Sequence, residues 1–182
     1  MIHPEEKLSS EEIFSGRIIR VVKDTVRLPN GRQSTREVAY HKSASAVLPI
    51  LPDGRLVLVE QYRYAVGEVV LEIPAGILEE GEDPMETAKR ELMEETGYLP
   101  GKLTELLVYY SSPGFTNEKI HIYLAEELTP AEKDPDFDEF LETRVLTLPE
   151  ALDLIKQGDL TDGKSLIAIC YYALLRGHRI IQ

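Results

Sequence analysis

Three glutamates lie close together in the stretch GILEEGEDPMETAKRELMEETGY, which runs from Gly76 to Tyr98. Glu91, Glu94 and Glu95 recur at a spacing that brings their carboxylates together on one face of a helix. Such carboxylates repel one another unless something neutralises them. They form either a solvated acidic face, the usual role of a charge run, or a site for a hard divalent cation such as Mg²⁺, which shares oxygen ligands with phosphates. The helix alone leaves both interpretations open.

Signals at both ends of the stretch predict the helix that these carboxylates need. Asp83 is a good N-cap residue, Pro84 suits the first helical position, and Glu86 follows at the spacing of a capping box. Gly97 is expected to end the helix. A separate apolar stripe at helical spacing consists of Met85, Ala88 and Leu92. The stretch therefore predicts a loop followed by an amphipathic helix.

The whole stretch resembles the Nudix box of the Nudix hydrolases, because every defined position of that box is matched. The matching residues are Gly76, Glu82, Arg90, Glu91, Leu92, Glu94, Glu95, Gly97 and Tyr98. A match of this length with mostly polar identities is very specific. The resemblance implies a loop–helix–loop that holds Mg²⁺ or Mn²⁺ and hydrolyses a nucleoside diphosphate linked to another moiety. It favours the cation site over the solvated face.

The resemblance also assigns roles within the site. Glu91 and Glu95 are the expected main metal ligands, and Glu94 is either a shared ligand or acts through another ligand. The backbone carbonyl of Ala75, just before the box, is implied as a further ligand. Arg90 precedes Glu94 by one turn and can orient it through a charge-assisted hydrogen bond.

A second informative stretch, SPGFTNE, runs from Ser112 to Glu118. Pro and Gly shape a loop, which alone is compatible with an ordinary hairpin and a surface glutamate. The pattern is similar to a loop of the ADP-ribose pyrophosphatases, a subfamily marked by a proline at a fixed distance past the box, and Pro113 matches that proline. The resemblance implies that Glu118 is the base that activates water and that Gly114 contacts the substrate.

Two arginines outside these stretches are candidates for substrate binding. Arg63, in EQYRY, is either a surface arginine or a phosphate clamp, since a guanidinium offers forked donors to phosphate oxygens. The similar EQxR segment of the ADP-ribose pyrophosphatases favours the clamp. Arg36 is either a solvated strand residue or, by resemblance, a contact to adenine. Ile18 and Ile19 stand where some relatives have an aromatic, so no aromatic contact is expected from that strand.

Composition limits the class of partner. The 182 residues carry a net charge of −12, with 43% apolar and 29% charged residues, which is typical of a soluble globular protein. The negative charge argues against nucleic acid and anionic membranes as partners. The single cysteine, Cys170, excludes an intrachain disulfide and is expected to be a buried apolar residue. No signal peptide or membrane-spanning run is seen, so a cytoplasmic location is expected.

The hydrophobic pattern predicts a mixed α/β chain with helices on both sides of a mixed sheet, and the resemblance makes it an α/β/α sandwich. Residues 1–43 are expected to form a small N-terminal antiparallel β module, with residues 1–15 as a loose lead-in and a hairpin turn at Asn30-Gly31. Residues 44–182 are expected to form the Nudix domain, with an exposed loop over 129–139. The module is too small to bury a core alone, and bacterial ADP-ribose pyrophosphatases, which resemble this layout, imply its exchange across a homodimer.

These expectations combine into one predicted reaction, the metal-dependent hydrolysis of ADP-ribose to AMP and ribose 5-phosphate. Within the same fold, the alternatives are another nucleoside diphosphate sugar, such as GDP-mannose, or a dinucleotide, such as NADH or diadenosine polyphosphate. A non-catalytic ADP-ribose sensor is disfavoured by the intact carboxylates. A purely structural acidic helix is disfavoured by the match to the whole box.

Overall fold

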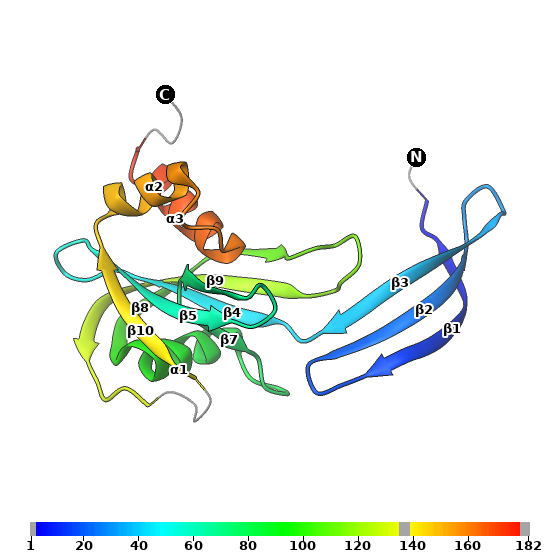
Figure 1. Ribbon diagram of the computed structural model, residues 1–182, viewed down its shortest axis with the longest axis horizontal. Helices are drawn as coiled ribbons and strands as arrows, with labels where there is room; N and C mark the ends of the chain where they lie inside the picture. Colours follow the sequence, from blue (N-terminus) through cyan, green and yellow to red (C-terminus); the bar gives the residue numbers. More distant parts are fainter. Residues whose placement is uncertain (1–2, 135–138, 179–182) are drawn as a thin grey trace. The chain divides into compact units, whose positions relative to one another are not determined.

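A computed structural model describes residues 3–134 and 139–178 (Figure 1). The chain divides into two compact units. The first unit contains Met1–Ser43 together with the loop Tyr109–Lys119, and the second contains Ala44–Val108 and Ile120–Gln182. The sequence did not indicate that the loop groups with the N-terminal residues.

The first unit contains a three-stranded antiparallel sheet. Its strands, in spatial order, are β1 (Glu6–Ser15), β2 (Ile19–Arg27) and β3 (Gln33–His41). The expected loose lead-in over residues 1–15 is therefore wrong for most of its length. β1 is exposed along nearly all of its length, so it lacks the apolar alternation that marks a half-buried strand. Its hydrogen bonds to β2 hold it instead. The turn at Asn30-Gly31 is confirmed, and Gly31 has a φ of 83°, which only glycine adopts without strain.

The loop of the first unit is joined to the end of β3. The Ala39 N–H donates to the Phe115 carbonyl at 2.8 Å, and the His41 N–H donates to Oδ1 of Asn117 at 2.9 Å. Ala39 also forms a parallel bridge with Thr116. The segment predicted to carry the catalytic base is thus fixed to the N-terminal module by hydrogen bonds from two backbone N–H groups of β3.

The second unit contains two sheets rather than the single mixed sheet that was expected. The larger sheet consists, in spatial order, of β7 (Ala75–Ile77), β4 (Ala44–Pro49), β9 (Lys119–Pro130) and β8 (Tyr98–Tyr110). It is mixed, because β4 runs parallel to β9 and antiparallel to β7. The smaller sheet is antiparallel and consists of β10 (Leu141–Leu146), β5 (Leu56–Arg63) and β6 (Glu68–Glu72).

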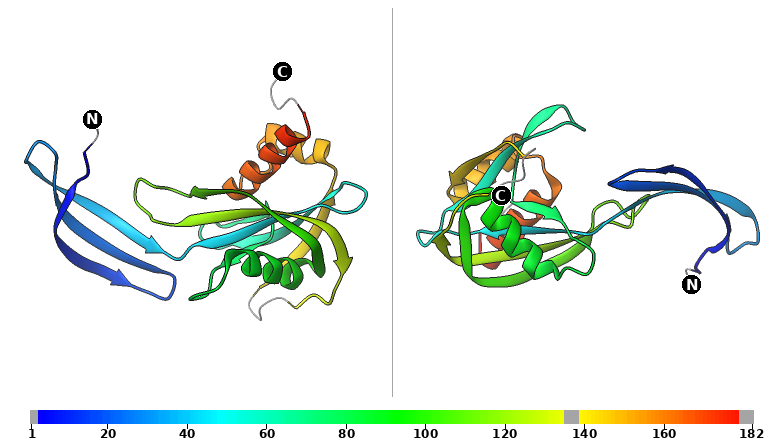
Figure 2. Two further views of the ribbon diagram at one scale, coloured as in Figure 1. Left: turned by 180° about the vertical axis from the view of Figure 1, so that it is seen from behind. Right: turned by 90° about the horizontal axis from the view of Figure 1, so that it is seen from below.

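Three helices complete the second unit. They are α1 (Pro84–Thr96), α2 (Leu148–Gln157) and α3 (Gly163–Leu175). Helix α1 lies on one side of the larger sheet, and α2 and α3 lie on the other (Figures 1 and 2). β4 is therefore covered on both faces, which explains its continuous apolar run. The α/β sandwich predicted from the sequence is confirmed.

The core under α1 fixes the helix that carries the box. Ala88 and Leu92, from the predicted stripe, are fully buried. They belong to one hydrophobic cluster with Val47 of β4 and with Tyr123 and Leu128 of β9. Met85, the third member of the stripe, is instead exposed. Burial of this apolar face fixes which side of α1 turns toward β7.

The ends of the helices largely follow the predicted capping signals. Asp83 caps α1, and its side chain accepts from the Met85 N–H at 2.8 Å. A capping box would instead have this side chain accept from the Glu86 N–H, one residue further along. Gly97 ends α1 with a φ of 74°. Thr147 and Glu150 form a complete capping box on α2. Among the described helices, none has both the length and the apolar character needed to cross a bilayer. The predicted loop over 129–139 begins after β9 ends at Pro130, and its residues 135–138 lie outside the described residues.

Candidate active site

Helix α1 buries two of the three clustered carboxylates. Glu91 and Glu95 are only 7% and 3% exposed, whereas Glu94 is half-buried. The stripe that packs into the core turns these two glutamates toward β7 as well. Burying a carboxylate costs free energy unless a cation or several donors compensate it. The solvated-face interpretation of Glu91 and Glu95 therefore does not hold.

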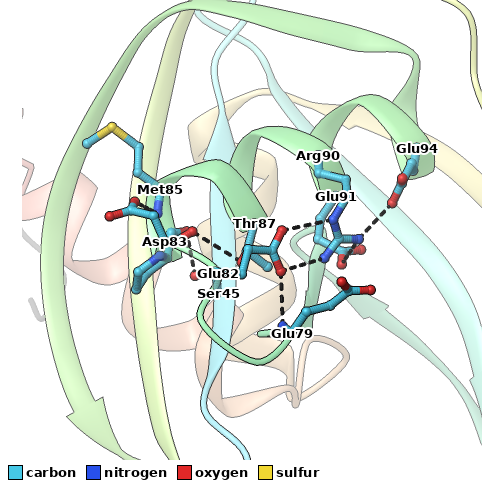
Figure 3. Close-up of polar contacts among 10 residues, drawn as sticks. Ser45, Glu79, Glu82, Asp83, Met85, Thr87, Arg90, Glu91 and Glu94 are labelled. Carbon is cyan, nitrogen blue, oxygen red and sulfur yellow. Dashed lines mark hydrogen bonds and ion pairs between the residues drawn. The ribbon is translucent and has the colours of Figure 1, made fainter.

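Arg90 binds three carboxylates at once (Figure 3). Its Nη1 donates to Oε1 of Glu91 at 2.7 Å and to Oε2 of Glu94 at 3.0 Å. Its Nε donates to Oε1 of Glu82 at 3.1 Å, and Glu82 also accepts from the Glu79 N–H at 3.0 Å. These bonds, chiefly the one from Arg90, lower the pKa of Glu82 to about 2. Glu82 is thereby held as a charged anchor for Arg90, which in turn orients Glu91 and Glu94.

The two buried carboxylates lack full compensation. Burial raises the pKa of Glu91 to about 7, although Arg90 acts against the shift. Burial raises the pKa of Glu95 to about 9, and the nearby charges of Glu91 and Glu139 raise it further. Both groups would bind a proton readily in the absence of another cation. This is the electrostatic state expected of ligands that a metal ion normally neutralises.

The backbone of β7 lies directly against these side chains. A Cβ added at Gly76 would lie only 1.9 Å from Oε1 of Glu91, so position 76 admits no side chain while Glu91 keeps this place. The N–H of Ala75 donates to Oε1 of Glu95 at 3.4 Å. Ala75, whose carbonyl was predicted to bind metal, is therefore a neighbour of Glu95.

The donor set fits a hard divalent cation. It consists of oxygens from buried carboxylates and adjacent backbone, which Mg²⁺ and similar ions prefer. Within residues 3–134 and 139–178, no three Asp, Glu, His or Cys side chains are already arranged to hold an ion. Arg90 instead occupies oxygens of Glu91 and Glu94. Residues that would hold the ion are Glu91, Glu95 and Ala75, with Glu94 beside them.

Glu139 is a member of this acidic cluster that the sequence did not reveal. Its charge contributes to the raised pKa of both Glu91 and Glu95, so it lies close to them. The segment around Glu139 was expected only to be an exposed acidic loop. The acid-rich composition of this segment was the one available signal. Composition does not indicate which distant helix the segment approaches.

Arg63 lies at the end of β5 and is held by a buried carboxylate. Its Nε and Nη2 donate to the two oxygens of Glu72 at 2.7 and 2.9 Å. Burial lowers the pKa of Arg63, but the bonds to Glu72 and the nearby charges of Glu72 and Glu95 raise it by more. The predicted phosphate clamp is thus in the same unit as the box and near one of its buried glutamates.

The other three predicted residues lie in the first unit. Arg36 donates through Nε and Nη2 to Glu5, at 2.9 and 2.5 Å. Oε1 of Glu118 is 3.3 Å from Nδ1 of His41. Gly114 has open space where a Cβ would stand. The structure therefore brings together Ala75, Arg90 and the box glutamates, while Arg36, Gly114 and Glu118 belong to the unit formed with the N-terminal sheet.

The site thus combines a glycine-containing strand with a helix that carries buried, clustered carboxylates. Two family models match the chain. The NUDIX domain matches residues 39–168, and the nucleoside diphosphate sugar hydrolase N-terminal domain matches residues 5–39. The chain therefore belongs to the Nudix hydrolase family, whose members generally use divalent metal ions.

Individual proteins resemble the chain along nearly its whole length. An ADP-ribose pyrophosphatase of Bacillus subtilis (strain 168) is 44% identical over 172 residues, which cover 93% of each chain. A methanol dehydrogenase activator of Bacillus methanolicus is 45% identical with the same coverage. A solved structure described as an ADP compounds hydrolase superposes with a TM-score of 0.88 at 24% identity, covering 100% of this chain and 99% of the other. This last likeness confirms the fold.

The raised pKa values predict how stability varies with pH in the metal-free protein. Because Glu91 and Glu95 have pKa values of about 7 and about 9 when folded, against 4.5 for an ordinary glutamate, the folded state keeps protons that the unfolded chain releases. Stability is then highest below about pH 4.5 with respect to these groups and falls as pH rises toward 9. Each retained proton contributes a slope of at most about 1.4 kcal/mol per pH unit.

Thermal unfolding in chelator at pH 6 and pH 8.5 measures this dependence. We expect a lower Tm at pH 8.5, a smaller difference in Glu95→Gln, and recovery of the Tm at pH 8.5 when Mg²⁺ is added, since an ion that binds only the folded state stabilises it. Glu86→Gln, at an exposed position of the same helix, should keep the wild-type slope. An equal slope in Glu95→Gln would contradict the assignment of the pH dependence to Glu95.

Proposed function

We propose that this Nudix hydrolase cleaves the diphosphate of ADP-ribose to give AMP and ribose 5-phosphate. The observation that carries the proposal is the buried pair Glu91 and Glu95 against the side-chain-free backbone at Gly76. It is supported by the 44% identity to an ADP-ribose pyrophosphatase over 93% of both chains. The substrate is thus a small nucleoside diphosphate sugar, and the net charge of −12 disfavours nucleic acid and anionic membranes as partners.

Each residue has a defined task in this reaction. Glu91, Glu95 and the Ala75 carbonyl would hold Mg²⁺ or Mn²⁺, with Glu94 beside them. When bound, the ion would supply charge neutralisation of the diphosphate and acidification of a bound water. Arg90 keeps Glu91 and Glu94 in place through the bonds described above.

Substrate and water are handled by residues outside the box. Arg63 donates to a phosphate oxygen, and Arg36 and Gly114 contact the remainder of the substrate. Glu118 accepts the proton of the water whose oxygen attacks one phosphorus. The bond from that phosphorus to the bridging oxygen then breaks, and the departing phosphate takes the electron pair.

We also propose that the protein is a cytoplasmic homodimer. The module of residues 1–43 is too small to bury a core of its own, and its sheet and the turn between β1 and β2 leave several large apolar side chains exposed. These are Ile13, Phe14, Ile18 and Ile19. Exchange of the module between two copies would cover apolar surface of this kind. Sedimentation of the full chain against a variant lacking residues 1–43 tests the dimer.

A product assay tests the function. Purified protein with Mg²⁺ or Mn²⁺ is given ADP-ribose, GDP-mannose, NADH and diadenosine polyphosphate in parallel, and the products are separated by chromatography. We expect AMP and ribose 5-phosphate from ADP-ribose, at a higher kcat/KM than for any other substrate, and no turnover in chelator. Faster cleavage of another member of the panel would reject ADP-ribose as the main substrate. Tight ADP-ribose binding with no turnover of any compound would support the sensor alternative.

One alternative substrate has specific support. A GDP-mannose pyrophosphatase of Yersinia enterocolitica is 34% identical over 150 residues, which cover 76% of this chain, and this keeps GDP-mannose as the second candidate. Comparison of kcat/KM for ADP-ribose and GDP-mannose in the same assay separates these two. The oxygen isotope pattern in products formed in ¹⁸O-labelled water identifies which phosphorus is attacked.

A further inference from the structure

A cluster of four charged side chains around the buried Glu72 joins the end of β5 and the end of β6 to the start of α3. Glu72 is only 2% exposed and receives the forked pair of hydrogen bonds from Arg63. Nζ of Lys164, a side chain that is 11% exposed, also bonds Glu72 and lies 3.1 Å from Asp162. Two cations and two carboxylates balance, so each charge of the cluster, including that of the buried Glu72, has a partner of opposite sign.

The cluster is connected by hydrogen bonds to the chain that enters the Nudix box. Asp162 accepts from the N–H and Oγ of Ser165, at 3.0 and 2.5 Å. Oγ of Ser165 in turn accepts from the Ile73 N–H at 2.8 Å. Ile73 lies two residues before Ala75, the residue beside Glu95. Ser165 and Ile73 therefore link the cluster by hydrogen bonds to the segment that enters the box.

Arg63 keeps donors available beyond this cluster. The pair with Glu72 uses Nε and one N–H of Nη2, whereas a guanidinium has five N–H donors. Within residues 3–134 and 139–178, no acceptor bonds Nη1, which is therefore left for another acceptor. The side chain of Arg63 is 44% exposed and lines a cavity of about 570 Å³ that Lys164, Val66 and Val70 also line. A cavity of this size suits a small molecule.

We propose that Lys164 is a positioning residue for Arg63 in the binding of the diphosphate. Lys164 neutralises and holds Glu72, and Glu72 fixes the guanidinium so that Nη1 faces an incoming phosphate oxygen. This inference rests on the proposed function, because it requires a diphosphate substrate at Arg63. Without the Lys164 charge, Arg63 alone would oppose two carboxylates, Glu72 and Asp162. The cluster would then be net negative and would repel phosphate.

Kinetics of Lys164 variants test the proposal. For Lys164→Met we expect KM for ADP-ribose to rise roughly 10-fold with a smaller change in kcat, the size typical of losing a group that orients a binding residue. Lys164→Arg keeps the charge and should restore most of the loss. Lys156→Met is the matched control, since Lys156 forms an exposed ion pair with Asp153 on α2. It should leave KM unchanged.

A double-mutant cycle separates positioning from a general structural role. If Lys164 acts through Arg63, Lys164→Met should change KM little in a chain that already carries Arg63→Met, because the effects of coupled residues are not additive. Additive effects on KM would overturn the proposal, and so would an unchanged KM in Lys164→Met. If Lys164→Met does not fold, Glu72→Gln replaces it in the same cycle. Glu72→Gln should then raise KM in the chain that keeps Arg63 and change KM little in the chain that carries Arg63→Met.

The outcomes distinguish this inference from the proposed function. A wild-type protein that cleaves no diphosphate in the panel rejects the proposed function and the role of Lys164 with it. Normal wild-type turnover of ADP-ribose combined with additive Lys164 and Arg63 effects rejects the role of Lys164 alone. If wild type prefers another diphosphate of the panel, the same cycle is run with that substrate and the same expected result.

Discussion

Replacing Glu95 with Gln is expected to lower kcat for ADP-ribose by about 1,000-fold or more, since an ion ligand can contribute several kcal/mol to stabilising the transition state. Glutamine has nearly the same shape as glutamate, so the packing under α1 should survive. Glu95 is 3% exposed and its pKa is raised to about 9. Removing its charge should therefore leave the metal-free protein at least as stable as wild type at pH 8.5.

Two measurements test this expected loss of activity. Steady-state turnover in saturating Mg²⁺ gives the loss in kcat, and titration calorimetry with the metal alone gives the loss in ion affinity. Glu86→Gln removes an exposed carboxylate from the same helix and should keep both near wild type. Near-normal turnover of Glu95→Gln would show that Glu95 is not a metal ligand. A large loss in Glu86→Gln would show that overall charge, rather than the ligand, is responsible.

Gly76→Ala is expected to have the second-largest effect, a loss in kcat of roughly 100-fold, the cost of displacing a reacting or binding group by about 1 Å. The added Cβ would lie 1.9 Å from Oε1 and 2.1 Å from the carboxyl carbon of Glu91. Glu91 is fixed by α1 and by Arg90, so the carboxylate must leave its place. Gly76 does not have a positive φ, so backbone strain does not contribute to the loss.

Gly163→Ala is the matched control for this substitution. Gly163 also has an ordinary φ and no neighbour within 4 Å of an added Cβ, and it starts a helix, where alanine is favourable. Because Gly163 lines the cavity beside Arg63, the comparison is made on metal affinity, which should be unchanged, and on Tm, which should be equal or higher. If Gly76→Ala keeps wild-type activity and metal affinity, the place of Glu91 in the structure does not matter for the reaction.

Local signals predicted the helix of the site well, because capping depends on residues close in sequence. Asp83 and Gly97 mark the two ends of α1, and both positions are confirmed. β1 was missed for the opposite reason. Its side chains are almost all exposed, and what holds it is a backbone ladder to β2 that leaves no hydrophobic pattern in the sequence. The division into two sheets also depends on pairings between distant strands.

The site shows the same limit. The spacing of Glu91 and Glu95 within one helix was sufficient to bring them together. Glu139, Glu72 and Lys164 gave no such signal, because their neighbours in space are far away in the chain. Glu118 remains a prediction from family resemblance, and the structure adds that its carboxylate has His41 as a neighbour in the first unit.

The parallel pairing of β4 with β9 has a consequence for the order of folding. β4 ends at Pro49 and β9 begins at Lys119, so this central ladder closes a long segment of chain, and the entropy of that closure opposes it until many contacts form together. The core under α1 needs Tyr123 and Leu128 of β9. On a ribosome, α1 therefore has no complete surface to pack on until residue 128 has left the exit tunnel. Until then, α1 is exposed to solvent. Its charged side chains keep it hydrated and disfavour its association with other segments before the core forms.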